Sequence, residues 1–242
     1  MKICVAQTRP VKGDIAANID KHIQLINLAV SGGAGVIIFP ELSLTGYEPT
    51  LAKQLAMDKD DARLNAFQQI SNDKNVTIGV GIPIQGDDKP AIGLVIFQPG
   101  KVRELYAKKY IHVDEEPFFV SGQSTIQSLG DKGDIALAIC YEISVDAHTQ
   151  KAFAGSAGIY IASVAKSVTG IGKALERLSY IANTYHATVL MSNCIGTCDG
   201  EDCAGKTSVF NNKGELLSQL KGGKEGILIF DTGTQEIIER SL

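Results

Sequence analysis

Three kinds of reactive side chain follow strand-like runs in this 242-residue sequence. Glu41 comes after the apolar run "VIIFP", Cys140 after "IALAI", and the lysines Lys108 and Lys109 after "ELYA". A thiol can attack a carbonyl or nitrile carbon, a carboxylate can take the thiol proton, and an ammonium group can stabilise the oxyanion. Together these residue types predict a thiol-dependent acyl transfer.

Each of these residues also has an ordinary alternative role. A free cysteine is commonly a small buried side chain, and a single glutamate or lysine at the end of a strand is commonly solvated. Their shared placement favours the joint role, because reactive residues in α/β sheets collect beyond the carboxyl ends of strands. Spacing alone does not show that the three segments meet, nor which of the two lysines would act.

The elements that must position these residues alternate along the chain. Apolar residues at three- and four-residue steps predict a helix after Asp14, its expected N-cap, and Ser144 is the expected cap of a helix after Cys140. Further helices are expected over 63–70 and 175–185, and strands over 2–7, 35–41, 76–84, 91–100, 101–111, 135–139, 158–163, 188–193, 206–211, 214–220 and 226–230. This order predicts an α/β fold in which helices cover both faces of buried sheets, as one domain over 1–242.

Composition limits the possible partners and location. The net charge of -4 gives no support for a nucleic-acid partner, and no apolar run is long enough to cross a bilayer. The N-terminal "MKICVAQTRP" predicts a strand rather than a signal peptide. Five cysteines, an odd number, do not suggest a disulfide framework. We therefore expect a cytoplasmic protein with reduced thiols.

Three of the cysteines, Cys194, Cys198 and Cys203, lie close together in "NCIGTCDGEDC". A metal site has to be considered, but the segment has no CxxC pair, and the nearest histidine, His186, comes before a predicted strand. We expect no metal here and interpret the segment as a loop that borders the active site.

Five segments run nearly from end to end of the chain: "KICVAQTRPVKGDIAANI", "FPELSLTGY", "YAKKYIH", "LAICYEIS" and "GKTSVFNNKGELL". On these segments and their order, the sequence resembles the nitrilase or carbon–nitrogen hydrolase superfamily. The resemblance implies that Cys140 is the nucleophile and Glu41 the general base. The family pattern of tyrosine, any residue, lysine selects Lys108 over Lys109.

The resemblance also implies further site residues. In "DEEPFF" it places a second catalytic-site glutamate at Glu115 rather than Glu116. It implies that Lys108 and the backbone N–H of Tyr141 bind the oxyanion. Glu142 is expected to be structural, because Glu41 takes the role of the base.

The implied activity is hydrolysis of a small linear amide through a thioester on Cys140, as in an amidase, an ω-amidase or an N-carbamoyl hydrolase. This chemistry needs no metal or organic cofactor. The implied fold is a four-layer α-β-β-α sandwich with two mixed sheets covered by helices. Relatives with this fold pair through helices near the active site, so we expect a homodimer or a higher homo-oligomer.

The chain departs from the family pattern in two segments, after the nucleophile (142–148) and in the loop "SVAKS" (163–167). Both segments should face the substrate, so the departures leave its identity open. Tyr47, Ser163 and Lys166 are candidates for the substrate pocket, and Lys166 could meet a substrate carboxylate.

Three other functions are alternatives to the amidase. A nitrile would form a thioimidate on Cys140 with the same three residues. A cysteine–histidine hydrolase could use His112 or His148 as its base, but would leave Glu41 and Lys108 without a role. A relative that only binds a small nitrogen compound should have lost one of the three residues, and none is lost.

Overall fold

Two mixed β-sheets form the centre of the computed structural model, which describes residues 1–130 and 133–242. Within these ranges the first sheet has seven strands and the second has six. In spatial order the first sheet contains β15 (Ile237–Ser241), β14 (Gly226–Asp231), β1 (Lys2–Gln7), β2 (Val36–Ile38), β3 (Thr77–Ile84), β4 (Ala91–Phe97) and β5 (Glu104–Ala107). The second contains β13 (Leu216–Gln219), β12 (Ser208–Phe210), β9 (Thr188–Ser192), β8 (Ile159–Ser163), β7 (Ile135–Ile139) and β6 (Ser128–Leu129).

Each sheet has a parallel centre and antiparallel edges. Strands β1, β2 and β3 run parallel to one another, as do β7, β8 and β9, whereas the outer strands of both sheets pair antiparallel. The carboxyl ends of the parallel strands therefore meet at one edge of each sheet, where reactive side chains collect in α/β proteins.

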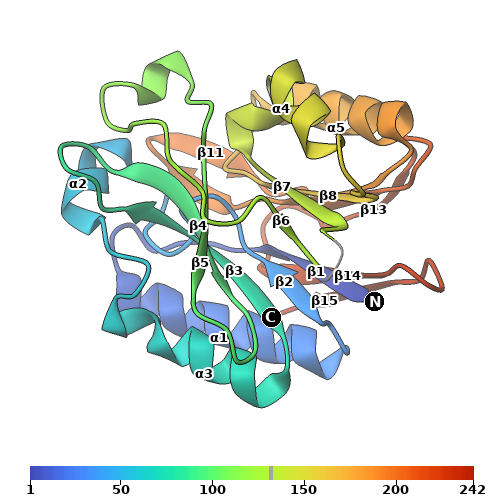
Figure 1. Ribbon diagram of the computed structural model, residues 1–242, viewed down its shortest axis with the longest axis horizontal. Coiled ribbons are helices and arrows are strands. Elements are labelled where there is room, and N and C mark those ends of the chain that lie inside the picture. Colours follow the sequence, from blue (N-terminus) through green and yellow to red (C-terminus); the bar gives the residue numbers. More distant parts are fainter. Residues whose placement is uncertain (131–132) are drawn as a thin grey trace.

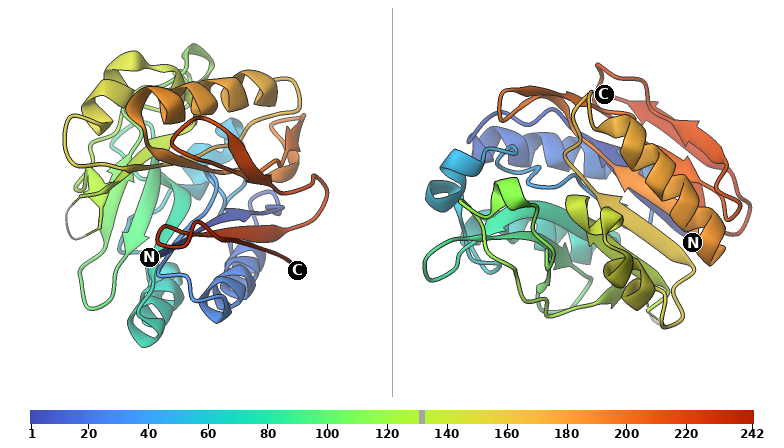
Figure 2. Two further views of the ribbon diagram at one scale, coloured as in Figure 1. Left: turned by 90° about the vertical axis from the view of Figure 1, so that its right-hand side faces the viewer. Right: turned by 90° about the horizontal axis from the view of Figure 1, so that it is seen from above.

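Helices cover the outer faces of the two sheets (Figures 1 and 2). Helices α1 (Ile15–Ser31) and α3 (Asn65–Lys74) lie on the first sheet, and α4 (Asp146–Ala152) and α5 (Ile171–Tyr185) lie on the second. The short α2 is Ala52–Leu55, and 3₁₀ turns occupy Pro49–Leu51, Ala62–Leu64, Val113–Glu115 and Cys140–Ser144. The expected four-layer α-β-β-α sandwich of two mixed sheets is thus confirmed.

Strand β1 shows how the layers are held together. Its side chains alternate, as the period of two in a strand requires, so that Ile3 and Val5 pack between the sheets while Cys4 and Ala6 pack under the helices. All four side chains are fully buried. A strand covered on both faces must be apolar throughout, and this explains the unbroken run "ICVA".

Several predicted boundaries shift in the structure. Asp14 caps α1 as expected, by accepting a hydrogen bond from the Ala17 backbone N–H. Ser144 does not cap the next helix, because the 3₁₀ turn that begins at Cys140 includes it, and α4 starts at Asp146. The strand expected over 101–111 is limited to Glu104–Ala107.

The segment expected to be a loop around the three cysteines is a β-hairpin. Strands β10 (Ile195–Cys198) and β11 (Glu201–Ala204) pair antiparallel as a separate two-stranded sheet. The hairpin is pinned to its surroundings, since Ile195 N–H donates to the Thr8 carbonyl and Ala204 N–H donates to the Lys166 carbonyl. In the part of the chain that the structure describes, no helix is long and apolar enough to cross a membrane.

Candidate active site

The ends of strands β2, β5 and β7 supply the candidate reactive residues. Glu41 follows β2 after Phe39 and Pro40, Lys108 directly follows β5, and Cys140 directly follows β7. The first two come from one sheet and Cys140 from the other. The two sheets pack face to face, which brings together segments that are about 30 to 100 residues apart in the chain.

Lys108 is the centre of a buried ionic cluster. Its Nζ lies 2.8 Å from Oε1 of Glu41 and 2.7 Å and 2.8 Å from the two carboxylate oxygens of Glu115. Burial alone would lower the pKa of Lys108, but the nearby charges of Glu41, Cys140 and Glu115 outweigh it and raise this pKa. The ammonium group is therefore charged across the whole physiological range.

Glu115 is fixed from several sides. Its carboxylate accepts hydrogen bonds from the Tyr47 hydroxyl at 2.9 Å and from the His112 backbone N–H at 2.9 Å, besides those from Lys108. The 3₁₀ turn Val113–Glu115 points this carboxylate inward, whereas the next residue, Glu116, is exposed. The structure thus brings Glu115 to the lysine, as the sequence favoured.

Glu41 has one oxygen engaged and one without a partner. Oε1 accepts from Lys108, while Oε2 is buried and has no hydrogen-bond partner among the described residues. Burial raises the pKa of Glu41, and the charge of Lys108 partly offsets this effect. A buried acceptor without a partner is costly in a folded protein, and such a group commonly has a catalytic explanation.

Cys140 lies within the electrostatic reach of this cluster. Burial and the charge of Glu41 raise the pKa of its thiol, while Lys166 and Lys108 lower it. Its backbone has a φ of 44°, in the left-handed region that a residue with a side chain rarely adopts. Such a strained position at a strand end is typical of functional residues.

The thiol opens into a cavity of about 320 Å³. Tyr47, Tyr141 and Lys166 line this cavity, as do residues of the β10–β11 hairpin. The charge interaction with Cys140 is the largest effect on the pKa of Lys166, and it raises this pKa. Asn193 holds the Lys166 backbone, accepting from its N–H at 2.8 Å and donating to its carbonyl at 3.2 Å.

Ser163 does not line the cavity, contrary to expectation. It is the last residue of β8, is almost fully buried, and donates its hydroxyl to the Phe39 carbonyl at 2.8 Å. Its position ties the second sheet to the segment that leads to Glu41. Lys109 points away from the cluster, with its ammonium group 5.4 Å from the centre of the Tyr110 ring.

Glu142 is a structural centre that the sequence only hinted at. Its carboxylate accepts from the Ile139 N–H at 2.9 Å, from the Lys109 N–H at 2.8 Å and from the Tyr106 hydroxyl at 2.8 Å. These bonds tie the residue before Cys140 to the residue after Lys108. In the sequence, only the position of Glu142 two residues after Cys140 indicated this role, because its partners Lys109 and Tyr106 come from a distant segment.

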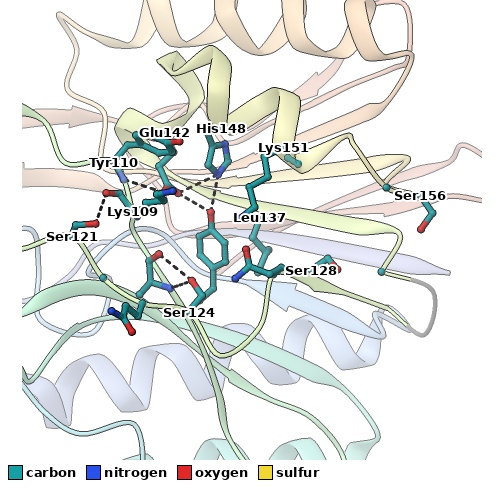
Figure 3. Close-up of a pocket in the computed structure, with 18 residues that line it drawn as sticks. Lys109, Tyr110, Ser121, Ser124, Ser128, Leu137, Glu142, His148, Lys151 and Ser156 are labelled. Atoms are coloured by element: carbon teal, nitrogen blue, oxygen red, sulfur yellow. Dashed lines mark hydrogen bonds and ion pairs between the residues drawn. The ribbon is translucent and has the colours of Figure 1, made fainter.

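A second, larger cavity of about 710 Å³ lies beside this network (Figure 3). Glu142 and His148 form part of its wall, and His148 Nε2 lies 2.8 Å from the Tyr106 hydroxyl. Cys140 does not line it. His148 is thus engaged away from the thiol. His112 lines the same cavity as Cys140, and its ring packs edge-on against Tyr141 with the ring centres 5.0 Å apart.

Comparison with known proteins agrees with this fold. The chain is 25% identical to the glutamine-dependent NAD(+) synthetase of Thermotoga maritima, over 100% of this chain and 44% of that protein. It is 23% identical to the arylacetonitrilase of Aspergillus niger, over 98% of this chain and 84% of that protein. The chain therefore spans less than half the length of the synthetases that it matches.

Solved structures with the same fold include amidases. The NitN amidase from Nesterenkonia sp. AN1 superposes with a TM-score of 0.85 at 23% identity, covering 96% of this chain and 92% of that chain. A mutant of the Nesterenkonia amidase in complex with butyramide superposes with a TM-score of 0.84 at 22% identity, covering 95% and 89%. The family model described as carbon-nitrogen hydrolase matches residues 2–239. The chain belongs to the carbon–nitrogen hydrolase family.

Proposed function

We propose that the protein hydrolyses the C–N bond of a small linear amide through a thioester on Cys140. The observation that supports this best is the geometry of Glu41. One of its carboxylate oxygens is held by Lys108, while the other is buried without a partner in the described structure, within electrostatic reach of the thiol. A base needs such a free lone pair next to the proton that it takes.

The proposed reaction has two halves. In the first, Glu41 takes the thiol proton as the sulfur of Cys140 attacks the amide carbon, and the carbonyl electrons move to oxygen. Lys108 and the backbone N–H of Tyr141 stabilise that oxyanion. When the oxyanion collapses, the C–N bond breaks, Glu41 gives its proton to the nitrogen, and ammonia or an amine leaves.

In the second half, water replaces the amine. Glu41 takes a proton from the water as the water oxygen attacks the thioester carbon. The C–S bond then breaks to release the acid, and Glu41 returns the proton to the sulfur of Cys140. Glu115 accepts hydrogen bonds from Lys108 throughout and so holds the ammonium group in place. This chemistry requires neither a metal nor an organic cofactor.

The cavity suggests the class of amide. Its volume of about 320 Å³ suits a molecule of a few heavy atoms, near the lower limit of ligand pockets in general. Lys166 provides a positive charge on its wall, which could pair with a substrate carboxylate. An ω-amide or an N-carbamoyl acid combines a short chain with such a carboxylate, and the synthetase relatives are named for their dependence on glutamine, itself an ω-amide.

Nitrile hydrolysis is the second candidate, because the chain also matches an arylacetonitrilase along most of both lengths. A nitrile would give a thioimidate on Cys140 and then release ammonia with the same base and the same cation. Both substrates end as the acid and ammonia, with one molecule of water consumed for the amide and two for the nitrile, so the two are distinguished by assaying each substrate separately.

Ammonia release tests the proposal directly. The substrates are ω-amides including glutamine, N-carbamoyl compounds, simple amides and nitriles, assayed with the wild type, Cys140→Ala and the control Cys4→Ala. Cys4 is buried in β1, away from the site, so its variant should keep the activity. We expect release from at least one substrate by the wild type and none by Cys140→Ala. A panel on which the two proteins behave alike would refute the enzymatic role of Cys140.

We further propose that the chain works as a homodimer or a higher homo-oligomer in the cytoplasm. The cytoplasm suits a protein in which all five cysteines are free thiols. The fold leaves α4 and α5 together on one outer face, close to the turn that holds Cys140 (Figure 2). Light scattering coupled to size exclusion should give at least twice the 25.8 kDa of the chain. A monomer at micromolar concentration would contradict this.

A further inference from the structure

Three thiols converge at the base of the β10–β11 hairpin. The sulfur atoms of Cys194, Cys198 and Cys203 all lie within 4.8 Å of one another, and those of Cys194 and Cys198 are 3.5 Å apart. The hairpin register explains this, because Cys203 pairs with Gly196, which lies midway between the other two cysteines. Residues two apart in a strand share a face, so the three side chains gather on one side.

The spacing of the sulfurs matches that of a metal site. Zinc–thiolate bonds of about 2.3 Å in a tetrahedron place the sulfurs roughly 3.8 Å apart. The sulfurs of Cys194 and Cys198 are 3.5 Å apart, and no pair of the three is more than 4.8 Å apart. Movements of a fraction of an ångström to about one ångström would therefore bring all three sulfurs onto one ion.

The surroundings favour a cation with one open position. Cys198 and Cys203 line the cavity that also contains Cys140, so a fourth ligand such as water could enter from that side. Asp199 and Glu201 line the same wall and add negative charge.

We propose that Cys194, Cys198 and Cys203 form a three-thiolate site for a thiophilic d¹⁰ cation, Zn²⁺ or Cu⁺, whose remaining position opens into the Cys140 cavity. Soft thiolate ligands select these two ions among the common biological metals. Zinc with three protein ligands keeps a fourth site for water. The site is independent of the amidase proposal, since it uses none of the residues assigned to the reaction.

Metal binding by the full-length chain tests the site. The reduced, chelator-treated protein is incubated with Zn²⁺, or anaerobically with Cu⁺, then desalted, and its metal is measured by mass spectrometry. We expect one ion per chain in the wild type and in Cys4→Ala, and a loss of that ion in Cys198→Ala and Cys203→Ala. Competition with a chromophoric chelator for each metal shows which of the two binds more tightly. Co²⁺ should give a thiolate charge-transfer band in the wild type that both variants lack.

Two further variants make the outcome decisive. Cys140→Ala should still bind the ion, so loss of binding in this variant would move the site to the catalytic thiol and overturn the proposal. Equal binding by the wild type and by the variants at Cys198 and Cys203, or no binding at all, would also overturn it. Circular dichroism checks each variant for folding. If the alanine variants do not fold, Cys203→Ser, at the cavity wall, replaces them, and its full retention of the metal would overturn the proposal.

Discussion

Lys166 is a second cation at the thiol, outside the cluster of Lys108. Its charge lowers the pKa of Cys140, against the larger opposing effect of burial. It lies in the loop where the chain departs from its family pattern, and Asn193 fixes its backbone. The same side chain can therefore favour the thiolate before substrate binds and neutralise a substrate carboxylate afterwards.

The Lys166→Met variant tests the first of these roles. Without the positive charge the pKa of Cys140 rises, so less thiolate is present at a given pH and alkylation by iodoacetamide becomes slower. The pH profile of the alkylation rate should shift to higher pH. Lys109→Met is the matched control, because that ammonium group lies over the Tyr110 ring. An unchanged profile in Lys166→Met would show that the lysine does not act on the thiol.

The Glu41→Gln variant tests the base. The amide keeps the size of the side chain but cannot take a proton, so kcat/KM for the best amide should fall by roughly 10² to 10⁴. Glu116→Gln, an exposed neighbour of Glu115, should leave it unchanged. Activity retained in Glu41→Gln would assign the proton transfer to another group.

At the scale of elements, Gly81 in β3 determines where Glu41 can lie. A Cβ at this position would clash with the Pro40 carbonyl oxygen and lie 2.6 Å from the Leu42 backbone nitrogen. The Leu44 N–H donates to the Gly81 carbonyl at 3.1 Å. The turn that contains Glu41 thus rests directly on the backbone of the neighbouring strand, and only glycine permits this approach.

The Gly81→Ala variant should displace that turn. We expect a loss of about 1–3 kcal/mol in the free energy of unfolding from overpacking, with a loss of amide hydrolysis as Glu41 moves. Urea unfolding and ammonia release measure the two effects. Gly172→Ala in α5 is the control, because nothing lies within 4 Å of the added methyl group. Full activity in Gly81→Ala would show that the turn tolerates the shift.

The sequence predicts elements well where the signal is local. Asp14 caps its helix as expected, because an N-cap depends on only a few neighbouring residues. Ser144 is wrongly expected to cap a helix, because Glu142 accepts a local hydrogen bond from the Ile139 N–H and a long-range one from the Lys109 N–H, and these bonds hold that segment in a 3₁₀ turn. The hairpin around the cysteines escaped prediction, since a short strand of glycine and polar residues has no apolar alternation.

The site shows the same division between local and long-range information. Strand ends and family motifs placed Cys140, Glu41 and Lys108, and the structure brings the glutamate and the lysine into contact. Ser163 occupies a strand end too, yet its side chain turns into the space between the sheets. The direction of the Ser163 side chain depends on the alternation of side chains along β8 and on the packing of the facing sheet, and no sequence motif indicates it.

At the scale of the whole molecule, His22 links helix α1 to residues on both sides of Glu41, namely Phe39 and Ser43. Its Nδ1–H donates to the Asn18 carbonyl at 2.6 Å, its Nε2 accepts from the Ser43 hydroxyl at 2.9 Å, and its ring stacks on Phe39 at 4.2 Å. Both nitrogens are thus satisfied in the neutral ring. Burial lowers the pKa of His22 from its usual value of 6.5 to about 4.

This pKa predicts how stability depends on pH. Below pH 6.5 the unfolded chain binds a proton at His22, while the folded chain does so only near pH 4. The contribution of His22 to the free energy of unfolding is therefore complete above pH 6.5 and is lost as the pH falls to about 4. Its size is about 3 kcal/mol.

Urea unfolding of the wild type and His22→Gln between pH 7 and pH 4 measures this contribution. Glutamine cannot titrate, so the variant should be less stable at pH 7 but should lose less stability on acidification. The difference between the two proteins should shrink as the pH falls. Parallel curves for both proteins would show that His22 has an ordinary pKa in the folded state.

The bonds of Glu142 have a consequence for which parts of the site can change over evolution. Through these bonds Glu142 joins Ile139, the residue directly before Cys140, to Lys109, the residue directly after Lys108. The two bonds thus connect the ends of strands from both sheets. The opposite wall of the cavity is formed by the hairpin and the loop of Lys166, which are joined mainly to each other. Insertions or substitutions in that wall would therefore reshape the cavity, while the strand ends that carry Cys140 and Lys108 stay joined to each other.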